Sequence, residues 1–265
     1  MQDPPSPTRL TASPLLPLLT LAAILGTFAV NIWSNLAPPG GQTIGEISNS
    51  RFAEVQITPA NYAFVIWGVI YLGLLTFGYH QLLPAQRHDA RLSAARPWLI
   101  LACLAQAVWV FWFLSGQIWL SVLAMLTILA ALIQVYRYLY RPLEMGHAVS
   151  RSERWRIRIP IGIYLGWISV ATMVNIAAAL YSQNWNGWGI SPQDWTVILI
   201  WIAAALGLWI SLQGQDRAFP LVISWALLAI AVRHLGNPAL AIPATIWALS
   251  LAGFVLLRQE VKASR

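Results

Sequence analysis

The segment that decides the fold runs from Pro97 to Tyr140 and reads PWLILACLAQAVWVFWFLSGQIWLSVLAMLTILAALIQVYRYLY. It contains one charged residue, Arg137, and only the tripeptide Ser115-Gly116-Gln117 separates its two apolar halves. Each half holds about 20 residues, the length that an α-helix needs to cross roughly 30 Å of hydrocarbon. A connection this short places consecutive helices side by side and antiparallel. The segment therefore predicts a hairpin of two membrane-spanning helices.

The rest of the chain repeats this pattern. Of its 265 residues, 58% are hydrophobic and 9% are charged, whereas a soluble domain carries about 25% charged residues. The polar residues are too few to cover a water-soluble particle, so the predicted fold class is all-α, a polytopic membrane helix bundle with about eight transmembrane helices. The predicted spans are Pro14 to Leu36, Tyr62 to Leu83, Pro97 to Leu114, Ile118 to Tyr140, Ile157 to Tyr181, Trp195 to Leu212, Phe219 to Leu235 and Ala239 to Leu257.

Basic residues indicate how the chain is oriented. When the loops between the predicted spans are assigned alternately to two sides, Arg51 and Arg233 fall on one side and all other arginines and lysines on the opposite side. The positive-inside rule then predicts an even number of spans with both termini in the cytoplasm, or in the stroma of a plastid. A bacterial inner membrane or a thylakoid membrane fits this topology. Orientation thereby explains the net charge of +7, so membrane lipids are expected as partners and nucleic acid is not.

The chain contains fifteen tryptophans, and they fall into two groups. Those at span ends or in loops are typical of the membrane–water interface, where the indole ring lies at headgroup depth. Those within the spans either pack against other helices and lipid or line a cavity. The interfacial group is Trp98, Trp119, Trp155, Trp185, Trp188 and Trp195.

Three predicted spans carry aromatic side chains at helical spacing, in two of them together with an amide. Residues three or four apart lie on one face of a helix, and a polar amide within the membrane normally faces the protein interior. Together the three stripes are predicted to enclose a flat, largely apolar ligand. The candidate ligand-binding residues are Phe64, Trp67 and Tyr71 in the second span, Gln106, Trp109, Trp112 and Phe113 in the third, and Tyr164, Trp167 and Asn175 in the fifth.

Signals for catalysis or metal binding are few. No Walker loop, H-E-x-x-H or G-x-S-x-G motif is present, and all acidic residues fall in predicted loops and tails, so no catalytic residue is assigned and the protein is not expected to be an enzyme. His80 and His234 lie near span ends. Either is a candidate axial ligand for haem iron or chlorophyll magnesium, but interfacial placement is the more ordinary interpretation. The longest predicted loop, Ala37 to Asn61, contains Pro38-Pro39-Gly40-Gly41 and is predicted to cap whatever opens toward it.

The fifth predicted span contains YLGWISVATMVN, from Tyr164 to Asn175. This segment resembles the last-helix pattern Y-L-x-W-[VI]-S-x-A-T-x-x-N of the tryptophan-rich sensory protein family, also called the translocator protein or TspO/MBR family. The family's N-x-x-W-x-x-x-F motif and its proline-rich entry with W-x-x-x-Y are similar to Gln106, Trp109 and Phe113, and more loosely to Pro59, Phe64, Trp67 and Tyr71.

The resemblance implies a division of the chain into a core and an extension. It covers about residues 14–181, which would form the family's five-helix bundle after a cytoplasmic tail at 1–13. A connecting loop at 182–194, a three-helix extension at 195–257 and a cytoplasmic tail at 258–265 would follow. The extension has no counterpart in a usual five-helix member.

The resemblance also implies a function. Family members bind tetrapyrroles, so the expected role is that of a binding or sensory protein for a tetrapyrrole or similar flat hydrophobic ligand. No cofactor is expected to be obligatory, and the candidate ligands are a porphyrin, a chlorophyll derivative or a carotenoid. One alternative is a structural or assembly subunit of a larger membrane complex, for example a photosynthetic one, whose other subunits bind residues 195–257. Another is a transporter for a small hydrophobic solute.

Overall fold

The computed structural model describes residues 15–140, 149–213 and 216–263, and in this part of the chain every regular element is helical. Seven of the described helices are long and apolar enough to cross a membrane, and one further apolar helix is shorter. The chain is therefore an integral, multi-pass membrane protein with a helix-bundle fold, as its sequence predicts. The predicted tail at 1–13 lies outside the described residues.

Five long helices form the part of the bundle that contains the aromatic stripes. The predicted hairpin is present, because α5 and α6 are joined only by residues 115–117 and pack along their lengths. Gly116 makes this turn with a positive φ of 73°, which glycine adopts without steric cost. The five helices are α1 (Leu15–Leu36), α3 (Ile66–Leu82), α5 (Ala90–Leu114), α6 (Ile118–Leu139) and α8 (Ile159–Ser182).

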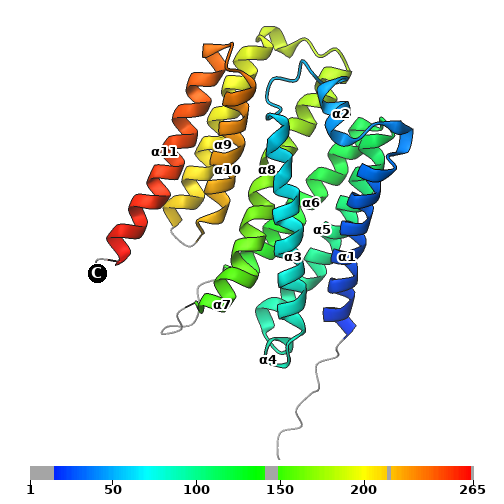
Figure 1. Ribbon diagram of the computed structural model, residues 1–265, viewed down its shortest axis with the longest axis vertical. Coiled ribbons are helices and arrows are strands. Elements are labelled where there is room, and N and C mark those ends of the chain that lie inside the picture. The colour runs from blue at the N-terminus through cyan, green and yellow to red at the C-terminus, as the bar shows by residue number, and fades with distance from the viewer. Residues whose placement is uncertain (1–14, 141–148, 214–215, 264–265) are drawn as a thin grey trace, which may run out of the picture.

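Three further helices, α9 (Pro192–Gln213), α10 (Ala218–Arg233) and α11 (Pro238–Ala263), stand beside α8 on the side away from α1 (Figure 1). The central one, α10, packs against α8, α9 and α11. At Gly166 of α8 a Cβ atom would lie 3.1 Å from the carbonyl oxygen of Phe219, so the missing side chain lets α8 and α10 approach closely. With 16 residues, α10 is about 24 Å long and shorter than the hydrocarbon core. Most of its residues are buried against these neighbours.

Short helical turns connect the long helices at both ends. Between α1 and α3 lie η1 (Pro39–Gly41), α2 (Ile44–Asn49) and η2 (Asn61–Val65). Toward the other end lie α4 (Pro84–Arg87), α7 (Arg151–Glu153) and the π-helical turn η3 (Arg154–Arg158), and η4 (Gly187–Gly189) precedes α9.

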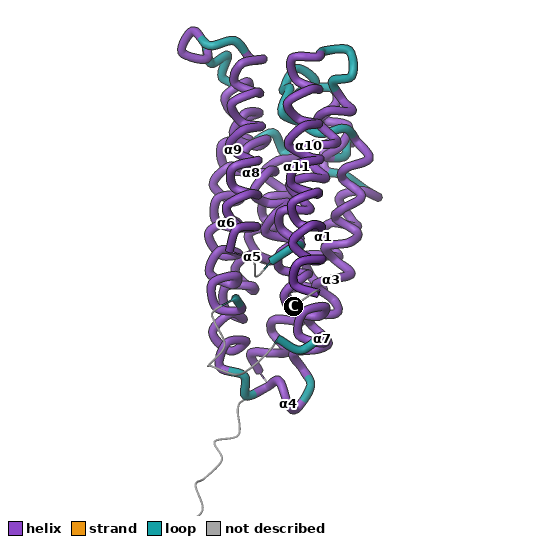
Figure 2. The backbone as a smooth tube through the Cα atoms, turned by 90° about the vertical axis from the view of Figure 1, so that its left-hand side faces the viewer, coloured by secondary structure: helices purple, strands orange, loops and turns teal. Residues whose placement is uncertain are grey.

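Successive long helices run in alternate directions, so α1 begins and α11 ends at the same end of the bundle (Figures 1 and 2). We call this the network end. The opposite end, here called the loop end, carries the cap loop (residues 37–61) and residues 183–191 and 234–237. Arg51 and Arg233 lie at the loop end, and the other described arginines lie toward the network end. The described helices thus have the even-numbered arrangement that the distribution of basic residues predicts.

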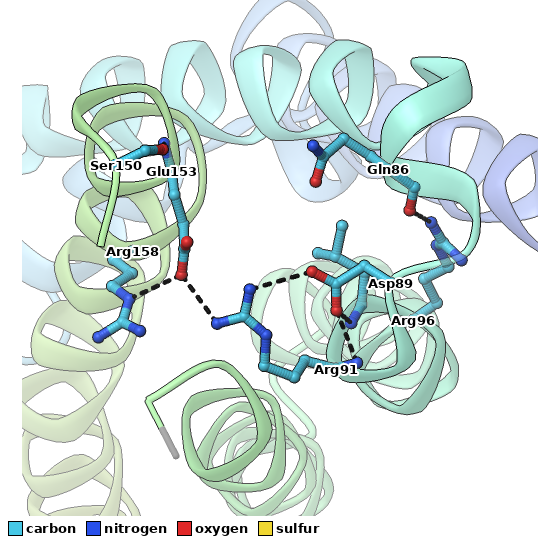
Figure 3. A network of polar contacts seen from close by, with 8 residues as sticks. Gln86, Asp89, Arg91, Arg96, Ser150, Glu153 and Arg158 are labelled. Carbon is cyan, nitrogen blue, oxygen red and sulfur yellow. Dashed lines mark hydrogen bonds and ion pairs between the residues drawn. The ribbon is translucent and has the colours of Figure 1, made fainter. Parts of the chain in front are cut away.

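At the network end a chain of ion pairs links α5 to α7 and η3 (Figure 3). The Arg91 guanidinium contacts Asp89 at 3.0 Å and Glu153 at 2.9 Å, and Nε of Arg158 contacts Glu153 at 3.2 Å. Burial alone would raise the pKa of Asp89, but the hydrogen bonds and charge of Arg91 and the backbone N–H groups of Leu92 and Arg91 outweigh it and lower that pKa. Asp89 is therefore held as a carboxylate.

Arg96 is the centre of a second set of contacts at this end and is only 2% exposed. Its Nε donates to Oε1 of Gln81 at 2.8 Å, and its Nη2 donates to the backbone carbonyl of Gln86 at 3.2 Å. Nε2 of Gln81 donates in turn to the carbonyl of Pro17 at 2.9 Å. These bonds connect α1, α3, α4 and α5 below the apolar core.

Two helices extend beyond their predicted ends. The helix α5 begins at Ala90 rather than at Pro97, because the Asp89 carboxylate accepts the N–H groups of Arg91 and Leu92 and caps it. At the other end of the chain α11 is helical as far as Ala263, so most of the predicted tail at 258–265 continues the last helix.

Asp216 fulfils a similar role for α10. Its Oδ1 accepts the N–H groups of Ala218 and Phe219 at 2.8 and 3.4 Å. The residue is 5% exposed and lies against Gly162 of α8, where a Cβ atom would come within 2.6 Å of Oδ2. Burial raises the pKa of Asp216 to about 6, although these N–H groups and the phenols of Tyr136 and Tyr140 oppose the rise.

Candidate ligand-binding site

An aromatic cavity lies at the loop end between α3, α5 and α8, beneath the cap loop, and we call it the first cavity. Its volume is about 50 Å³. Three helices that are far apart in the sequence contribute its walls, as the stripes predict. Six of the ten predicted ligand-binding residues line it, namely Phe64, Trp67, Trp109, Phe113, Trp167 and Asn175.

The rings of this cavity contact one another across the helices. Trp67 and Phe64 both meet Trp167 edge-on, with ring centroids 6.4 and 5.7 Å apart. On the opposite wall Trp109 and Phe113 stack at 5.3 Å. Edge-on and stacked pairs are the arrangements that aromatic quadrupoles favour, so the walls hold each other in place.

Three more predicted residues do not line the cavity but adjoin the residues that do. Tyr71 stacks on Trp67 at 5.8 Å, and Tyr164 meets Trp67 edge-on at 6.2 Å. The Tyr164 hydroxyl donates to Oε1 of Gln106 over a long 3.5 Å. These buried side chains support the aromatic wall from below.

Trp112 is the one predicted site residue that the structure does not bring to this cluster. It is partly buried against the core and does not line the cavity. Six residues after Gln106, it points about 120° away around the helix, whereas Phe113 comes back to within about 20° of Gln106. Trp112 is therefore close to Trp109 in sequence but lies off the helix face that lines the cavity.

Asn175 is bonded within the protein rather than left free. Its Oδ1 accepts the indole N–H of Trp109 at 2.9 Å, and its Nδ2 donates to the hydroxyl of Ser121 at 3.0 Å. The amide thus ties α8 to α5 and α6. Sequence reasoning missed Ser121, and its only signal was a small polar residue inside an apolar span.

Other polar groups of the cavity have no partner. The indole Nε1 of Trp167 and the hydroxyl of Thr58 are buried, line the cavity and make no hydrogen bond. Nearby, Nε2 of Gln106 and the hydroxyl of Tyr71 are also buried without a partner. A buried polar group without a hydrogen bond is costly, and each of these four can donate one. The site therefore offers hydrogen bonds to an acceptor that enters it.

The cap loop closes the cavity mainly with side chains that sequence reasoning did not single out. Ile44, Ser48, Phe52 and Thr58 line it, beside Pro59, which the family resemblance had included. The Phe52 ring is 2% exposed and lies 6.0 Å from that of Phe113. Phe52 occupies a segment without helical periodicity, so no pattern of spacing could identify it.

The same loop is held from its other side by α10 and the residue that follows it. Backbone, guanidinium and imidazole groups all take part, so the cap loop joins the two parts of the bundle. The contacts to the cap loop are Ala60 N–H to the carbonyl of Ala229 at 3.1 Å, Arg233 Nη2 to the carbonyl of Ala53 at 3.0 Å, and His234 Nε2 to the carbonyl of Gln56 at 2.7 Å. Just after the loop, Trp225 Nε1 donates to the carbonyl of Ala63 in η2 at 3.3 Å.

The two candidate axial ligands lie at opposite ends of the bundle. His80 is buried near the end of α3 at the network end, and His234 contacts the cap loop at the loop end. Neither lines the first cavity. Over the described residues, no group of three or more His, Cys, Asp or Glu side chains is close enough to hold a metal ion.

A protein-family model described as "TSPO-like protein" matches residues 17–257 of the chain. The match runs beyond the five helices to which the sequence resemblance pointed and includes α9, α10 and most of α11. Comparison with curated proteins and with solved structures gave no match.

Proposed function

Because the chain belongs to the TSPO-like protein family, we propose that it is a membrane binding or sensory protein for a tetrapyrrole or similar flat hydrophobic ligand. One observation carries this proposal: the first cavity has aromatic walls and two buried, unpartnered hydrogen-bond donors, on Trp167 and Thr58. Flat conjugated rings stack on indole and phenyl faces. A carboxylate or carbonyl oxygen on the same ligand would satisfy the free donors, and no chemical change of the ligand is proposed.

Binding requires the cap loop to move. Pockets for small molecules usually measure about 300–1,000 Å³, whereas the first cavity measures about 50 Å³. Ile44, Ser48 and Phe52 of the cap loop line it, and in this proposal the buried Phe52 ring takes the space that a ligand would need. Displacement of Phe52 would extend the aromatic walls of α3, α5 and α8 into one continuous slot. The ligand would then replace the Phe52 ring.

The proposed orientation follows the basic residues. The network end, with most of the arginines, would face the cytoplasm or stroma, and the cap loop would face the periplasm or the thylakoid lumen. A bacterial inner membrane and a thylakoid membrane are the proposed locations. The ligand would reach the cavity from the loop end or laterally from the lipid.

A titration with protoporphyrin IX tests the proposal. Binding to purified protein in nanodiscs should quench tryptophan fluorescence saturably, because the cavity contains Trp67, Trp109 and Trp167. Ala171 lines this cavity on α8, so Ala171→Trp should fill it and weaken binding by at least about tenfold. The matched control is Ala177→Trp, on the same helix but outside this cavity. Unsaturable quenching, or equal quenching in the two variants, would reject the proposal.

The filled state of the first cavity also favours a second candidate function. In a structural or assembly subunit of a larger membrane complex, the inherited pocket would stay occupied by Phe52 and α9 to α11 would bind neighbouring subunits. Gentle solubilisation of native membranes followed by affinity purification distinguishes the two. Stoichiometric recovery of other membrane subunits, together with no porphyrin binding, would favour assembly, and recovery of this chain alone would reject it.

A further inference from the structure

A second, larger cavity lies on the other side of α8, between α8, α9 and the cap loop. Its volume is about 520 Å³, within the range of about 300–1,000 Å³ that small-molecule sites occupy. It shares no lining residue with the first cavity. Met173, Ala177 and Leu180 of α8 and Leu199 of α9 supply apolar walls, and residues 54–57 of the cap loop close one side.

Three indole rings gather at this second cavity. Trp185 lies 5.3 Å from both Trp188 and Trp195, and the latter two are 6.2 Å apart, measured between ring centroids. The N–H of Trp195 donates to the carbonyl of Gly187 at 2.9 Å, which fixes its ring. The cluster presents aromatic faces to a cavity whose other walls, apart from Tyr181 and a few polar residues, are aliphatic.

The backbone at the rim is unusual. Trp188 has a φ of 54°, a left-handed conformation that costs a bulky residue of order 1 kcal/mol or more. Its side chain is nevertheless 78% exposed, so burial of the ring does not offset this cost within the chain. Residues held in such conformations are concentrated at binding sites.

The polar groups of the cavity leave an acceptor free. The Thr196 hydroxyl donates to Pro192, and the Asn186 side-chain oxygen accepts the N–H of Trp188. The side-chain oxygen of Gln56, in contrast, is buried and has no hydrogen-bond partner. The Glu54 carboxylate adds a further acceptor among the lining residues. A ligand that matches these groups must bring a hydrogen-bond donor.

We propose that the second cavity is a separate binding site for an apolar ring compound that carries a hydroxyl group. The rings pack against Trp185, Trp188 and Trp195 and between α8 and α9, and the hydroxyl donates to the side-chain oxygen of Gln56. The helix α9 and residues 185–188, both outside the five-helix part of the bundle that contains the first cavity, supply most of the aromatic surface. Binding at the second cavity does not depend on the ligand proposed for the first cavity.

Photolabelling with 4-hydroxybenzophenone tests this site, because the probe is itself a two-ring compound with one hydroxyl. On the full-length protein in nanodiscs, labelling of peptides within residues 173–199 should saturate. Competing 4-methoxybenzophenone, which has the same rings but no donor, should need about tenfold higher concentration, the difference that one hydrogen bond to a buried acceptor provides. Gln56→Met should abolish that preference.

Two matched substitutions on α8 separate this proposal from the first. Ala177→Trp fills the second cavity and should abolish saturable labelling, whereas Ala171→Trp fills the first and should leave it intact. Leu199→Trp blocks the second cavity from α9 and replaces Ala177→Trp if that variant does not fold. Unsaturable labelling, labelling that survives both blocking variants, or a hydroxyl preference that persists in Gln56→Met would overturn the proposal.

Discussion

The two ends of α8 use their buried polar groups in opposite ways. At the network end Arg91, Glu153 and Arg158 are paired (Figure 3). The buried Arg96 has oxygen partners on α3, α4 and α5. At the loop end Trp167, Thr58 and Gln56 each keep a buried polar atom without a partner, beside cavities of about 50 and 520 Å³. The Arg91 and Arg96 networks are satisfied within the protein, and in the described part of the chain His80 Nδ1 and Asp216 Oδ2 are the buried atoms toward the network end that have no partner. The unpartnered atoms of Trp167, Thr58 and Gln56, in contrast, belong to residues that line cavities.

This difference indicates how the bundle can tolerate unpaired polar groups at its loop end. Each unpaired buried group costs about 1–3 kcal/mol, and fully bonded polar networks elsewhere make the fold specific enough to accept that cost. Substitutions at the network end should therefore change stability and leave binding specificity alone. Substitutions at the loop end should change binding or local opening.

The largest expected effect is that of Gln81→Leu at the network end. Leucine keeps most of the volume but leaves the Arg96 Nε and the Pro17 carbonyl without their partners, so we expect a loss of about 3 kcal/mol in the free energy of unfolding. Thermal unfolding in detergent measures it. Gln86→Leu is the matched control, because Arg96 bonds the backbone carbonyl of Gln86 and not its side chain. Equal melting temperatures of the two variants would contradict the role of this network.

Phe52→Ala is the corresponding change at the loop end. Phe52 is 2% exposed, so truncation should cost about 3 kcal/mol without ligand, while the enlarged first cavity should bind protoporphyrin IX more tightly than wild type does. Porphyrin should then raise the melting temperature of the variant more than that of the wild type. Phe111→Ala, at a half-exposed position on α5, serves as control and should change neither quantity much. A porphyrin response equal to that of wild type would show that Phe52 does not obstruct the site.

The sequence predicts the loop end better than the network end. Apolar length and the short turn at residues 115–117 were sufficient to predict the hairpin and the alternating helices. The acidic residues were all assigned to loops and tails, yet Asp216 is buried against Gly162. Hydropathy cannot predict the burial of Asp216, because it depends on which helix packs against that loop. The bonds of Gln81 and Arg96 depend in the same way on the packing of α1, α3 and α5.

Helical spacing in the sequence identified the cavity residues that lie on helices and missed those that lie in loops. Trp67, Trp109 and Trp167 line the first cavity, because each repeats at helical intervals with its neighbours. Phe52 and Thr58 have no such periodicity. Trp185, Trp188 and Trp195 were interpreted as interfacial, and the structure gathers them at one cavity. Their clustering depends on the turn at residues 184–190, whose positive φ angles at Asn184 and Trp188 have no sequence signal.

A pH-dependent effect tests whether Asp216, whose buried Oδ2 has no hydrogen-bond partner, is left unsatisfied as a carboxylate at the network end. Its pKa of about 6 lies above its ordinary value, so the protonated form is favoured in the fold. Its stabilising contribution is complete below about pH 4 and is lost as the pH rises through about 6. Asp216→Asn should therefore match wild type near pH 4 and exceed it by about 3 kcal/mol at pH 8. Asp194→Asn at an exposed position is the control, and a difference between Asp216→Asn and wild type that does not vary with pH would refute the assignment.

The smallest expected effect concerns the link between α10 and the cap loop. Arg233 donates to the carbonyl of Ala53 at 3.0 Å and more weakly to Asn49 at 3.5 Å. Because a partly exposed hydrogen bond contributes only about 0.5–1 kcal/mol, Arg233→Gln should accelerate amide hydrogen exchange in residues 49–57 by about two- to fivefold and leave global unfolding unchanged. Arg217→Gln, at the network end, should not alter exchange in this segment. Unchanged exchange in Arg233→Gln would mean that Ala60 and His234 hold the cap loop without the arginine. Faster exchange throughout the bundle would instead show that Arg233 stabilises the whole fold. That result would contradict the expectation that substitutions at the loop end change local opening and not global stability.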